Sequence, residues 1–306
     1  MPGPATNEQF GDLLEPRFQD IKNDVLRQLP DMVFEVFSDG GTNGRSDMRF
    51  SDVGAFGDIP RFTGTVTYDT VAQGYDTTLT PLEFASGFQV ERKLFDDDQY
   101  GIMDARPSGL VRAYVRTRQS HAFRPFNNAF SVDTLFYNNS EGVALCSNSH
   151  TTTAAGVSTA TGFDNLTTAA LSATAVTAMK IQGRGLRDDR GNRIETVWDE
   201  LWYPSDLEDV AYEIINSAGK PTDATNAANY HYGKYTGKTS VYMSDTNNYF
   251  LADSMLRKES LVWSDRIGME FAMVEDFDTL VAKWRLYGRW GNAHKGWRWI
   301  VGAQVS

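Results

Sequence analysis

The chain carries at residues 82–91 the stretch Leu82-Glu83-Phe84-Ala85-Ser86-Gly87-Phe88-Gln89-Val90-Glu91, and the rest of the fold can be worked out from it. Its larger apolar side chains recur at even spacing, and a period of two is typical of a β-strand with one apolar face. Ten strand residues span about 34 Å. Because this is longer than a small domain is wide, we expect the strand to project and its apolar face to need cover from elsewhere.

A second alternating stretch lies upstream, at residues 62–68, and residues 72–76 between the two have the composition of a turn. We therefore predict an extended β-hairpin over residues 51–92. Neighbouring subunits should cover its apolar face. The residues expected in that subunit interface are Phe62, Val66, Tyr68, Phe84 and Phe88.

An N-terminal arm, residues 1–50, precedes the hairpin. The run Thr6-Asn7-Glu8-Gln9 has the form of a helix capping box, and apolar residues follow it at near-helical spacing. Pro30 should end this helix, and residues 38–44 have loop composition. An amphipathic helix outside a compact region needs a partner, so the interface should also include Phe10, Leu13 and Leu14.

A long helix is predicted from Pro107 to Arg124, because proline suits the first helical position and Pro125 should end the helix. An apolar stripe runs along it. Three arginines fall elsewhere on its surface, and they could contact phosphate or acidic neighbours, although a solvated face is the favoured interpretation. These arginines are Arg112, Arg116 and Arg118.

The C-terminal half has the pattern of a second unit followed by strands. Ser172 should cap an Ala-rich helix, and residues 188–192 should form a turn. Strands are predicted at 198–203, 241–243 and 249–251, with a helix that a capping box at Ser205 and Glu208 begins. The last segment is strand-rich: residues 280–287 alternate, and five of the seven tryptophans follow residue 262.

Composition excludes several classes of protein. The chain has 306 residues and a net charge of −11, whereas dedicated nucleic-acid binders usually show a basic footprint. A single cysteine, Cys146, excludes an internal disulfide framework. No stretch approaches the roughly 18 apolar residues of a membrane span. The first residues lack the regions of a signal peptide, so we expect a protein of the cytoplasm or of something assembled there.

No catalytic, metal or cofactor site emerges from the sequence, and we expect a protein without enzymatic activity. Cys146 and His150 could pair as nucleophile and base, but a small core thiol is favoured. Residues 96–98 are three aspartates, which favour a solvated run over a cation site. Residues 283–290 interleave basic and aromatic side chains, and a half-buried strand is favoured over a nucleic-acid stacking surface.

Arms, loops and sheets without a site suit a protein whose function is association. Identical subunits that close into a symmetric shell bury apolar arms and hairpins on their neighbours. Each contact can then be weak, because many contacts per subunit add through avidity.

Several motifs, in the right order, resemble the major head subunit of Mu-like tailed phages. The resemblance covers roughly residues 136–300, about half of the chain. The motifs are Ala144-Leu145-Cys146-Ser147-Asn148-Ser149-His150, Asn165-Leu166, Ala170-Leu171-Ser172-Ala173-Thr174, Asp188-Asp189-Arg190-Gly191-Asn192, Tyr203-Pro204-Ser205-Asp206-Leu207-Glu208, Ser244-Asp245-Thr246-Asn247-Asn248-Tyr249-Phe250-Leu251 and Asp276-Phe277-Asp278-Thr279-Leu280-Val281-Ala282-Lys283.

This resemblance implies an α+β Hong Kong 97-type capsid fold. In that fold an N-terminal arm leads to an extended loop, a peripheral domain with a long spine helix, and an axial α/β domain near the capsomer centre. The segments predicted above fall in that order. The expected divisions are an arm at 1–50, an extended hairpin loop at 51–92, a peripheral domain at 93–190, an axial domain at 191–252 and return strands of the peripheral domain at 253–306.

The function implied is that of a major capsid protein, which self-assembles into the icosahedral head of a tailed bacteriophage around double-stranded DNA. The implied partners are copies of itself in hexamers and pentamers, scaffold, portal and cement proteins, and packaged DNA held by non-specific proximity, with no membrane. The implied location is the virion capsid, assembled in the host bacterial cytoplasm. Arg112, Arg116 and Arg118 would then be an interior basic set.

Two alternatives stay open at this point. One is the shell of a cellular nanocompartment with the same fold, which would hold an enzyme and no DNA. The other is a hydrolase that uses Cys146 and His150.

Overall fold

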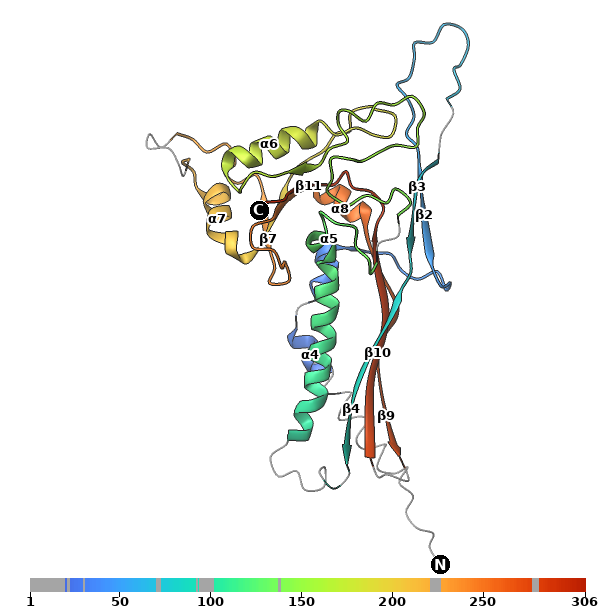
Figure 1. Cartoon of the computed structure of the whole chain (residues 1–306), viewed down its shortest axis with the longest axis vertical. Helices are drawn as coiled ribbons and strands as arrows, with labels where there is room; N and C mark the ends of the chain where they lie inside the picture. Colours follow the sequence, from blue (N-terminus) through green and yellow to red (C-terminus); the bar gives the residue numbers. More distant parts are fainter. Residues whose placement is uncertain are drawn as a thin grey trace, which may run out of the picture.

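The computed structural model describes residues 20, 23–29, 31–69, 73–91, 93, 102–136, 139–220, 227–276 and 281–306. The expectations for the capping box at 6–9, for Phe10, Leu13 and Leu14, and for the aspartates at 96–98 fall outside these residues. The architecture is a mixture of helices and sheets, as predicted. Figure 1 shows a long lower part, an upper part that extends to one side, and a loop that projects at the other side.

The lower part is a four-stranded sheet with one long helix beside it (Figure 1). The strand order is β1-β9-β10-β4, and the two longest strands, β9 and β10, form an antiparallel pair. The helix α4 packs against β4 and β10. The bounds are β1 Ser38–Asp39, β4 Leu82–Glu91, α4 Ile102–Ala122, β9 Leu261–Asp276 and β10 Val281–His294.

The predicted pairing of residues 62–68 with residues 82–91 is wrong. Strand β4 instead pairs antiparallel with β10, in a register that places Leu82 opposite Trp290 and Glu91 opposite Val281. Both strands alternate, so their apolar faces coincide: Trp284 and Leu286 are buried while Lys283 and Arg285 are exposed. This confirms the half-buried strand that was favoured for residues 283–290.

The hairpin lies further upstream than predicted. Strands β2 (Met48–Val53) and β3 (Gln73–Leu79) form a separate two-stranded sheet, and residues 62–68 belong to the irregular loop that connects them. Met48 and Phe50 pack against Leu79, which is fully buried. Met48 lies opposite Leu79 in the register, so apolar side chains fix one end of this pairing. Gly64, with a φ of 106°, breaks the expected strand near its centre.

Helix α4 begins five residues before the position predicted, and Pro107 lies inside it. A proline in the second turn removes only one backbone hydrogen bond, and here its ring is buried, which offsets part of that loss. The helix ends before Pro125, which is placed in the first turn of the short helix α5 (Arg124–Asn127). The apolar stripe is confirmed, since Val111 and Tyr114 are buried.

The upper part contains a five-stranded sheet in the order β5-β11-β8-β6-β7. Helix α6 packs against β8 and β11, and α7 packs against β7. Ser172 caps α6 as predicted, because its side chain accepts a hydrogen bond from the Ala175 N–H at 3.1 Å. The bounds are β5 Leu166–Thr167, α6 Ala173–Arg184, β6 Glu200–Tyr203, α7 Glu208–Asn216, β7 Thr236–Thr239, β8 Tyr249–Ala252 and β11 Ile300–Ala303.

Two local predictions in this unit are wrong. Residues 241–243 form a turn, and the strand lies earlier, at β7. The capping box at Ser205 does not form: Ser205–Leu207 is a 3-10 turn, η1, and α7 begins at Glu208 without a side-chain cap. The 3-10 turn supplies the first hydrogen bond from the Leu207 N–H to the Pro204 carbonyl at 3.0 Å, so a serine cap is not needed.

The division at residues 191 and 252 does not follow the sheets. Strand β5 precedes residue 191, and β11 follows residue 252, yet both pair within the five-stranded sheet. Residues 300–303 therefore belong to the five-stranded sheet, whereas β9 and β10 pair within the four-stranded sheet. The division into peripheral and axial domains stays a prediction. A strand can join any sheet whose edge it reaches, so sequence position alone does not assign β11 to a sheet.

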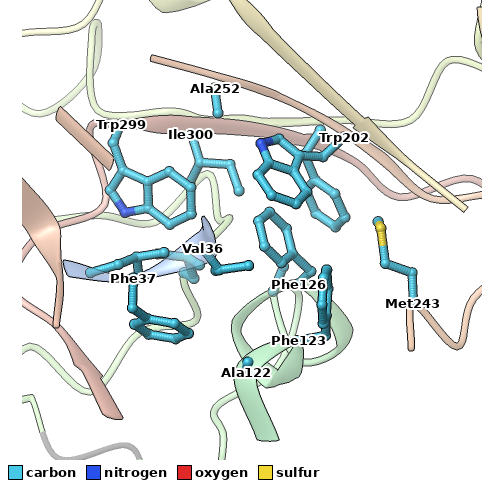
Figure 2. Packing of buried hydrophobic residues seen from close by; sticks show 14 of the residues in the cluster. Val36, Phe37, Ala122, Phe123, Phe126, Trp202, Met243, Ala252, Trp299 and Ile300 are labelled. Carbon is cyan, nitrogen blue, oxygen red and sulfur yellow. The ribbon is translucent and has the colours of Figure 1, made fainter. Parts of the chain in front are cut away.

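The core lies where the two parts meet. Figure 2 shows Val36 and Phe37 from the N-terminal segment, Phe123 and Phe126 from the start and the body of α5, Trp202 from β6 and Trp299 from the turn just before β11. Phe126 stacks on Trp202 with ring centroids 4.8 Å apart. Two short helices complete this junction, α2 (Val33–Val36) and α8 (Ser254–Ser260). Burial of these aromatic rings holds the upper and lower parts together.

Candidate subunit interfaces

The loop between β2 and β3 exposes a row of large apolar side chains. It projects beyond the rest of the molecule at the top of Figure 1. The most exposed is Ile59 at 96%, and the least exposed is Val66 at 59%. Soluble monomers rarely expose so many large apolar groups together, and such patches mark protein interaction sites. The residues of this set, called the loop patch below, are Val53 at the end of β2 and, in the loop, Phe56, Ile59, Phe62, Val66 and Tyr68.

Polar contacts from the predicted turn at 188–192 hold both sides of this loop. The Asp189 carboxylate accepts a hydrogen bond from the Ala55 N–H at 3.3 Å. The Asn192 side-chain amide donates to the Phe56 carbonyl at 3.3 Å. The Arg190 guanidinium lies 2.9 Å from the Asp69 carboxylate. The loop is thus held in a defined position with its apolar side chains outward.

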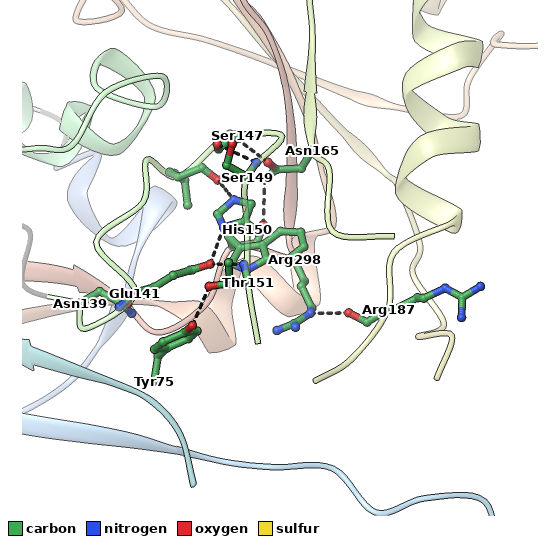
Figure 3. A network of polar contacts seen from close by, with 12 residues as sticks. Tyr75, Asn139, Glu141, Ser147, Ser149, His150, Thr151, Asn165, Arg187 and Arg298 are labelled. Carbon is green, nitrogen blue, oxygen red and sulfur yellow. Dashed lines mark hydrogen bonds and ion pairs between the residues drawn. The ribbon is translucent and has the colours of Figure 1, made fainter. Parts of the chain in front are cut away.

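A polar network anchors the base of the hairpin to the body (Figure 3). The Tyr75 hydroxyl and the Thr151 hydroxyl lie 2.6 Å apart. The Thr151 N–H donates to the Glu141 carboxylate at 2.9 Å, and a His150 ring nitrogen lies 3.0 Å from the same oxygen. The His150 ring is buried and stacks on Trp297 with centroids 4.0 Å apart. The His150 end of this network is buried and the Thr151 end is exposed. Together its hydrogen bonds fix the direction of the hairpin.

Charged groups also gather at this base, where Arg298 and Asp189 are half-buried. Burial raises the pKa of Asp52, and the neighbouring Asp189 carboxylate raises it further. Burial lowers the pKa of the Arg298 guanidinium, while Asp189 and Asp52 oppose that shift. The Arg298 Nε donates to the Arg187 carbonyl at 2.6 Å. One half-buried arginine therefore compensates two nearby carboxylates, which keeps the hairpin base close to the body.

Phe84 and Phe88, two residues of the predicted interface, are covered by their own chain. Phe84 stacks on Trp290 at 4.2 Å and Phe88 stacks on Trp284 at 4.9 Å, measured between ring centroids. Both are half-buried in the main core. The expectation that neighbouring subunits alone cover them is wrong, because Trp284 lies opposite Phe88, and Trp290 lies diagonal to Phe84, whose register partner is Gly288. Phe62, Val66 and Tyr68 are exposed and stay candidate interface residues.

The three arginines of α4 do not form one set. Arg118 forms an ion pair with Asp265 at 2.6 Å, and its guanidinium lies over the Trp263 ring at 5.5 Å. Its side chain is mostly buried, so it connects the helix to β9 and is not free for another partner. Arg112 and Arg116 are exposed and four residues apart, so they share one face of the helix.

Cys146 and His150 do not form a nucleophile and base pair. Burial raises the pKa of the Cys146 thiol far above neutral pH, which keeps it protonated. The two His150 ring nitrogens contact the Glu141 carboxylate and the Leu145 carbonyl. The histidine therefore orders the network of Figure 3, and the thiol fills the core beside Gly302, where an added Cβ would lie 2.7 Å from its sulfur.

Sequence reasoning missed half of the loop patch and the buried ion pair at the junction. Val53, Phe56 and Ile59 lack strand alternation, so only their exposure in the folded chain identifies them. Arg257 and Glu200 lie 57 positions apart and pair at 2.7 Å in the core. Two signals in the sequence pointed toward these features. The alternation of Met48 and Phe50 indicates strand β2, which precedes the loop. An arginine among core residues, such as Arg257, needs a buried acidic partner.

No helix in the described part of the chain is both long and apolar enough to cross a membrane. The model of a protein family described as phage capsid protein matches residues 74–303, about three quarters of the chain. No curated protein matches the sequence. The narrower likeness to Mu-like phages stays a prediction.

Solved structures share the fold at low sequence identity. The capsid of a native GTA particle has a TM-score of 0.57 at 13% identity, with 91% of each chain covered. The capsid of the cyanophage Pam1 has a TM-score of 0.58 at 10% identity, covering 89% of this chain and 91% of the other. The capsid of Ralstonia phage GP4 has a TM-score of 0.55 at 8% identity, covering 88% and 87%.

Proposed function

The chain belongs to the phage capsid protein family, and we propose that it is the major subunit that self-assembles into the icosahedral head of a tailed bacteriophage around double-stranded DNA. The observation that carries the proposal is the loop patch. Six large apolar side chains project from a loop that the body holds in place. An isolated subunit would leave this surface in water, whereas a shell covers it.

The loop patch of one subunit docks on the body of its neighbour in this proposal. Fully burying one Phe or Ile side chain stabilises a contact by roughly 1.5–3 kcal/mol before the cost of association is counted. Each subunit then contributes one loop and receives another, so many modest contacts add around a closed shell. Hexamers and pentamers of the same chain, and scaffold, portal and cement proteins, are the partners that this role requires.

Arg112 and Arg116 remain candidates for a surface that faces the packaged DNA. They are exposed on α4 and share one helix face, and their side chains suit non-specific contacts with phosphate. Replacing both by glutamate should lower the DNA content of the particles and leave the shell intact. Unchanged DNA content would remove this part of the proposal.

Electron microscopy of the expressed protein, with its scaffold supplied where needed, tests the main proposal. We expect closed particles of many subunits. After nuclease treatment, particles made in infected cells should retain protected DNA. Protein that stays monomeric under all assembly conditions contradicts the proposed function. Particles that hold a co-purifying enzyme and no DNA would instead indicate a nanocompartment shell.

A further inference from the structure

A second exposed surface lies at the end of the five-stranded sheet away from the β2–β3 hairpin, where Figure 1 shows α6 and α7. One part of it is basic and aromatic. Lys180 and Arg184 lie on α6, and the loop before β7 adds the exposed Tyr230 and Lys234. The Lys234 ammonium lies 3.3 Å from the centre of the Tyr230 ring, and the Lys180 ammonium lies 5.5 Å from it. Ile181 is exposed beside them on α6.

This basic patch, defined as Lys180, Ile181, Arg184, Tyr230 and Lys234, is held in a fixed shape. His231 joins the loop to α6, since its Nε2 lies 2.9 Å from the Ala173 carbonyl. Asn229 joins the same loop to α7 by donating to the Ile214 carbonyl at 2.8 Å. Three positive charges are thus placed around one phenol ring, and they lower the pKa of Tyr230.

The other part of this surface is acidic, and it lies on α7 and the turn before it. All four of its carboxylate residues are exposed. Val210 and Tyr212 are exposed among them, at 39% and 65%. This acidic face is defined as Asp206, Glu208, Asp209, Val210, Tyr212 and Glu213.

No ion pair within the described part of the chain neutralises either surface. In the part of the chain that the structure describes, the ion pairs involve other residues, and none joins a cation of the basic patch to a carboxylate. The same holds for the four carboxylates of the acidic face. Like charges gathered without counter-charges disfavour an isolated subunit and favour a partner of opposite charge.

We propose that the basic patch of one subunit binds the acidic face on α7 of the next copy, in a head-to-tail contact that closes the ring of each capsomer. This inference rests on the proposed shell function and names the contact at the axial end. Each copy supplies one surface of each kind, which is the requirement for a heterologous contact that repeats around a ring. Both surfaces also mix charge with exposed apolar side chains, as protein interfaces do.

DNA is the less suitable occupant of the basic patch. Phosphate binding would use the three cations and leave Ile181 exposed to water. It would also bring DNA to the end of the subunit that carries the four carboxylates of α7, which repel it. A second copy satisfies both surfaces at once, and shell assembly brings copies together at high local concentration.

Charge reversal tests the contact. The first variant reverses the patch, with Lys180→Glu and Lys234→Glu. The second combines it with Asp209→Lys and Glu213→Lys, which lie four residues apart on one face of α7. We expect the first variant to raise the protein concentration for half-maximal assembly by about tenfold, because several pairs per ring are lost. The swapped variant should return to within about twofold of wild type, a difference that surface substitutions alone can cause.

The matched control is Lys258→Glu, an exposed lysine on α8 outside both surfaces, which should assemble as wild type does. Circular dichroism and thermal melting check that each variant folds. If the reversed variant unfolds, the neutral pair Lys180→Gln and Lys234→Gln replaces it, and a smaller loss of assembly is then expected.

The outcomes separate this inference from the proposed function. Normal assembly of the reversed or neutral variant overturns the contact, as does a swapped variant that folds without recovering assembly. Intact particles with less DNA would identify the basic patch as a DNA contact and also overturn it. Wild-type protein that forms no particles contradicts the proposed shell function itself, and the contact with it.

Discussion

The Arg257 guanidinium and the Glu200 carboxylate form a buried ion pair, with the Arg257 Nε donating to Glu200 at 2.7 Å and Nη2 donating at 2.9 Å. The same guanidinium donates to the Glu35 carbonyl at 3.0 Å and to the Val36 carbonyl. Arg257 belongs to α8, Glu200 to β6 and Val36 to α2. One side chain therefore connects the N-terminal segment, the upper sheet and the helix that leads into the lower sheet.

Replacing Arg257 with methionine should destabilise the subunit by about 3–5 kcal/mol, because the Glu200 carboxylate is left buried without a counter-charge and keeps only the Trp202 indole as a hydrogen-bond donor. Urea unfolding followed by circular dichroism measures this. The matched control is Lys238→Met, which removes the more exposed ion pair with Glu35 and should cost less than about 1 kcal/mol. Equal losses for the two variants would show that Arg257 acts through its aliphatic stem alone.

Phe62→Asp should impair assembly and leave the stability of the subunit almost unchanged. Its side chain is 69% exposed on the projecting loop, so the folded monomer loses little contact. Sedimentation measures assembly, and thermal melting measures stability. The comparison is Phe84→Ala, which removes the stacking on Trp290 and should destabilise the folded subunit by about 2 kcal/mol. A Phe62→Asp protein that assembles normally would exclude this residue from the interface.

Acid should destabilise the subunit through His121. Burial, followed by the nearby Arg124 charge, lowers the pKa of His121 to about 4. The unfolded chain binds a proton near pH 6.5, whereas the folded chain binds it only near pH 4. The contribution of His121 to the free energy of unfolding is therefore fully present above pH 6.5 and is lost as the pH drops toward 4. The loss is about 1–2 kcal/mol, because solvent screens the charge of this half-buried ring.

Urea unfolding at pH 7, 5.5 and 4 tests this pH dependence. His121 accepts a hydrogen bond from the Trp290 indole at 3.2 Å, so a variant must keep the packing and lose the titration. His121→Gln satisfies this condition, and it should show a weaker loss of stability on acidification than wild type. An identical pH profile for both proteins would assign the acid sensitivity to other groups.

Cys146 should resist alkylation in the native protein at neutral pH and react only on unfolding. Its thiol is buried and its pKa is raised by that burial. Mass spectrometry after iodoacetamide treatment, with and without urea, measures the modified fraction. Rapid native labelling would restore Cys146 as a candidate reactive group.

Local patterns in the sequence predicted the positions of helices and strands well, but they predicted less well which strands pair with each other. The alternation of Trp284 and Leu286 predicts β10, and Ser172 predicts the start of α6, because these signals depend only on neighbouring positions. The partner of β4 depends on a strand about 200 residues later. The sequence offered residues 62–68 as a nearer candidate, and Gly64, which weakens a strand there, was the one local sign against it.

The same reason limits prediction of the interface. A strand such as 82–91 shows that one face is apolar, and it cannot show whether β10 or another subunit covers that face. Phe62 and Phe84 look alike in the sequence, yet one is exposed on a loop and the other stacks on Trp290. Loop residues such as Ile59 have no period at all, so exposure in the folded chain is the only signal.

The pairing of β4 with β10 also bears on when a subunit becomes competent. Leu82 meets Trp290, so the lower sheet lacks a central strand until the last few dozen residues have left the ribosome. Contacts so distant in sequence form slowly. We therefore expect a chain whose synthesis stops before β10 to lack the completed lower sheet, and so not to enter a growing particle.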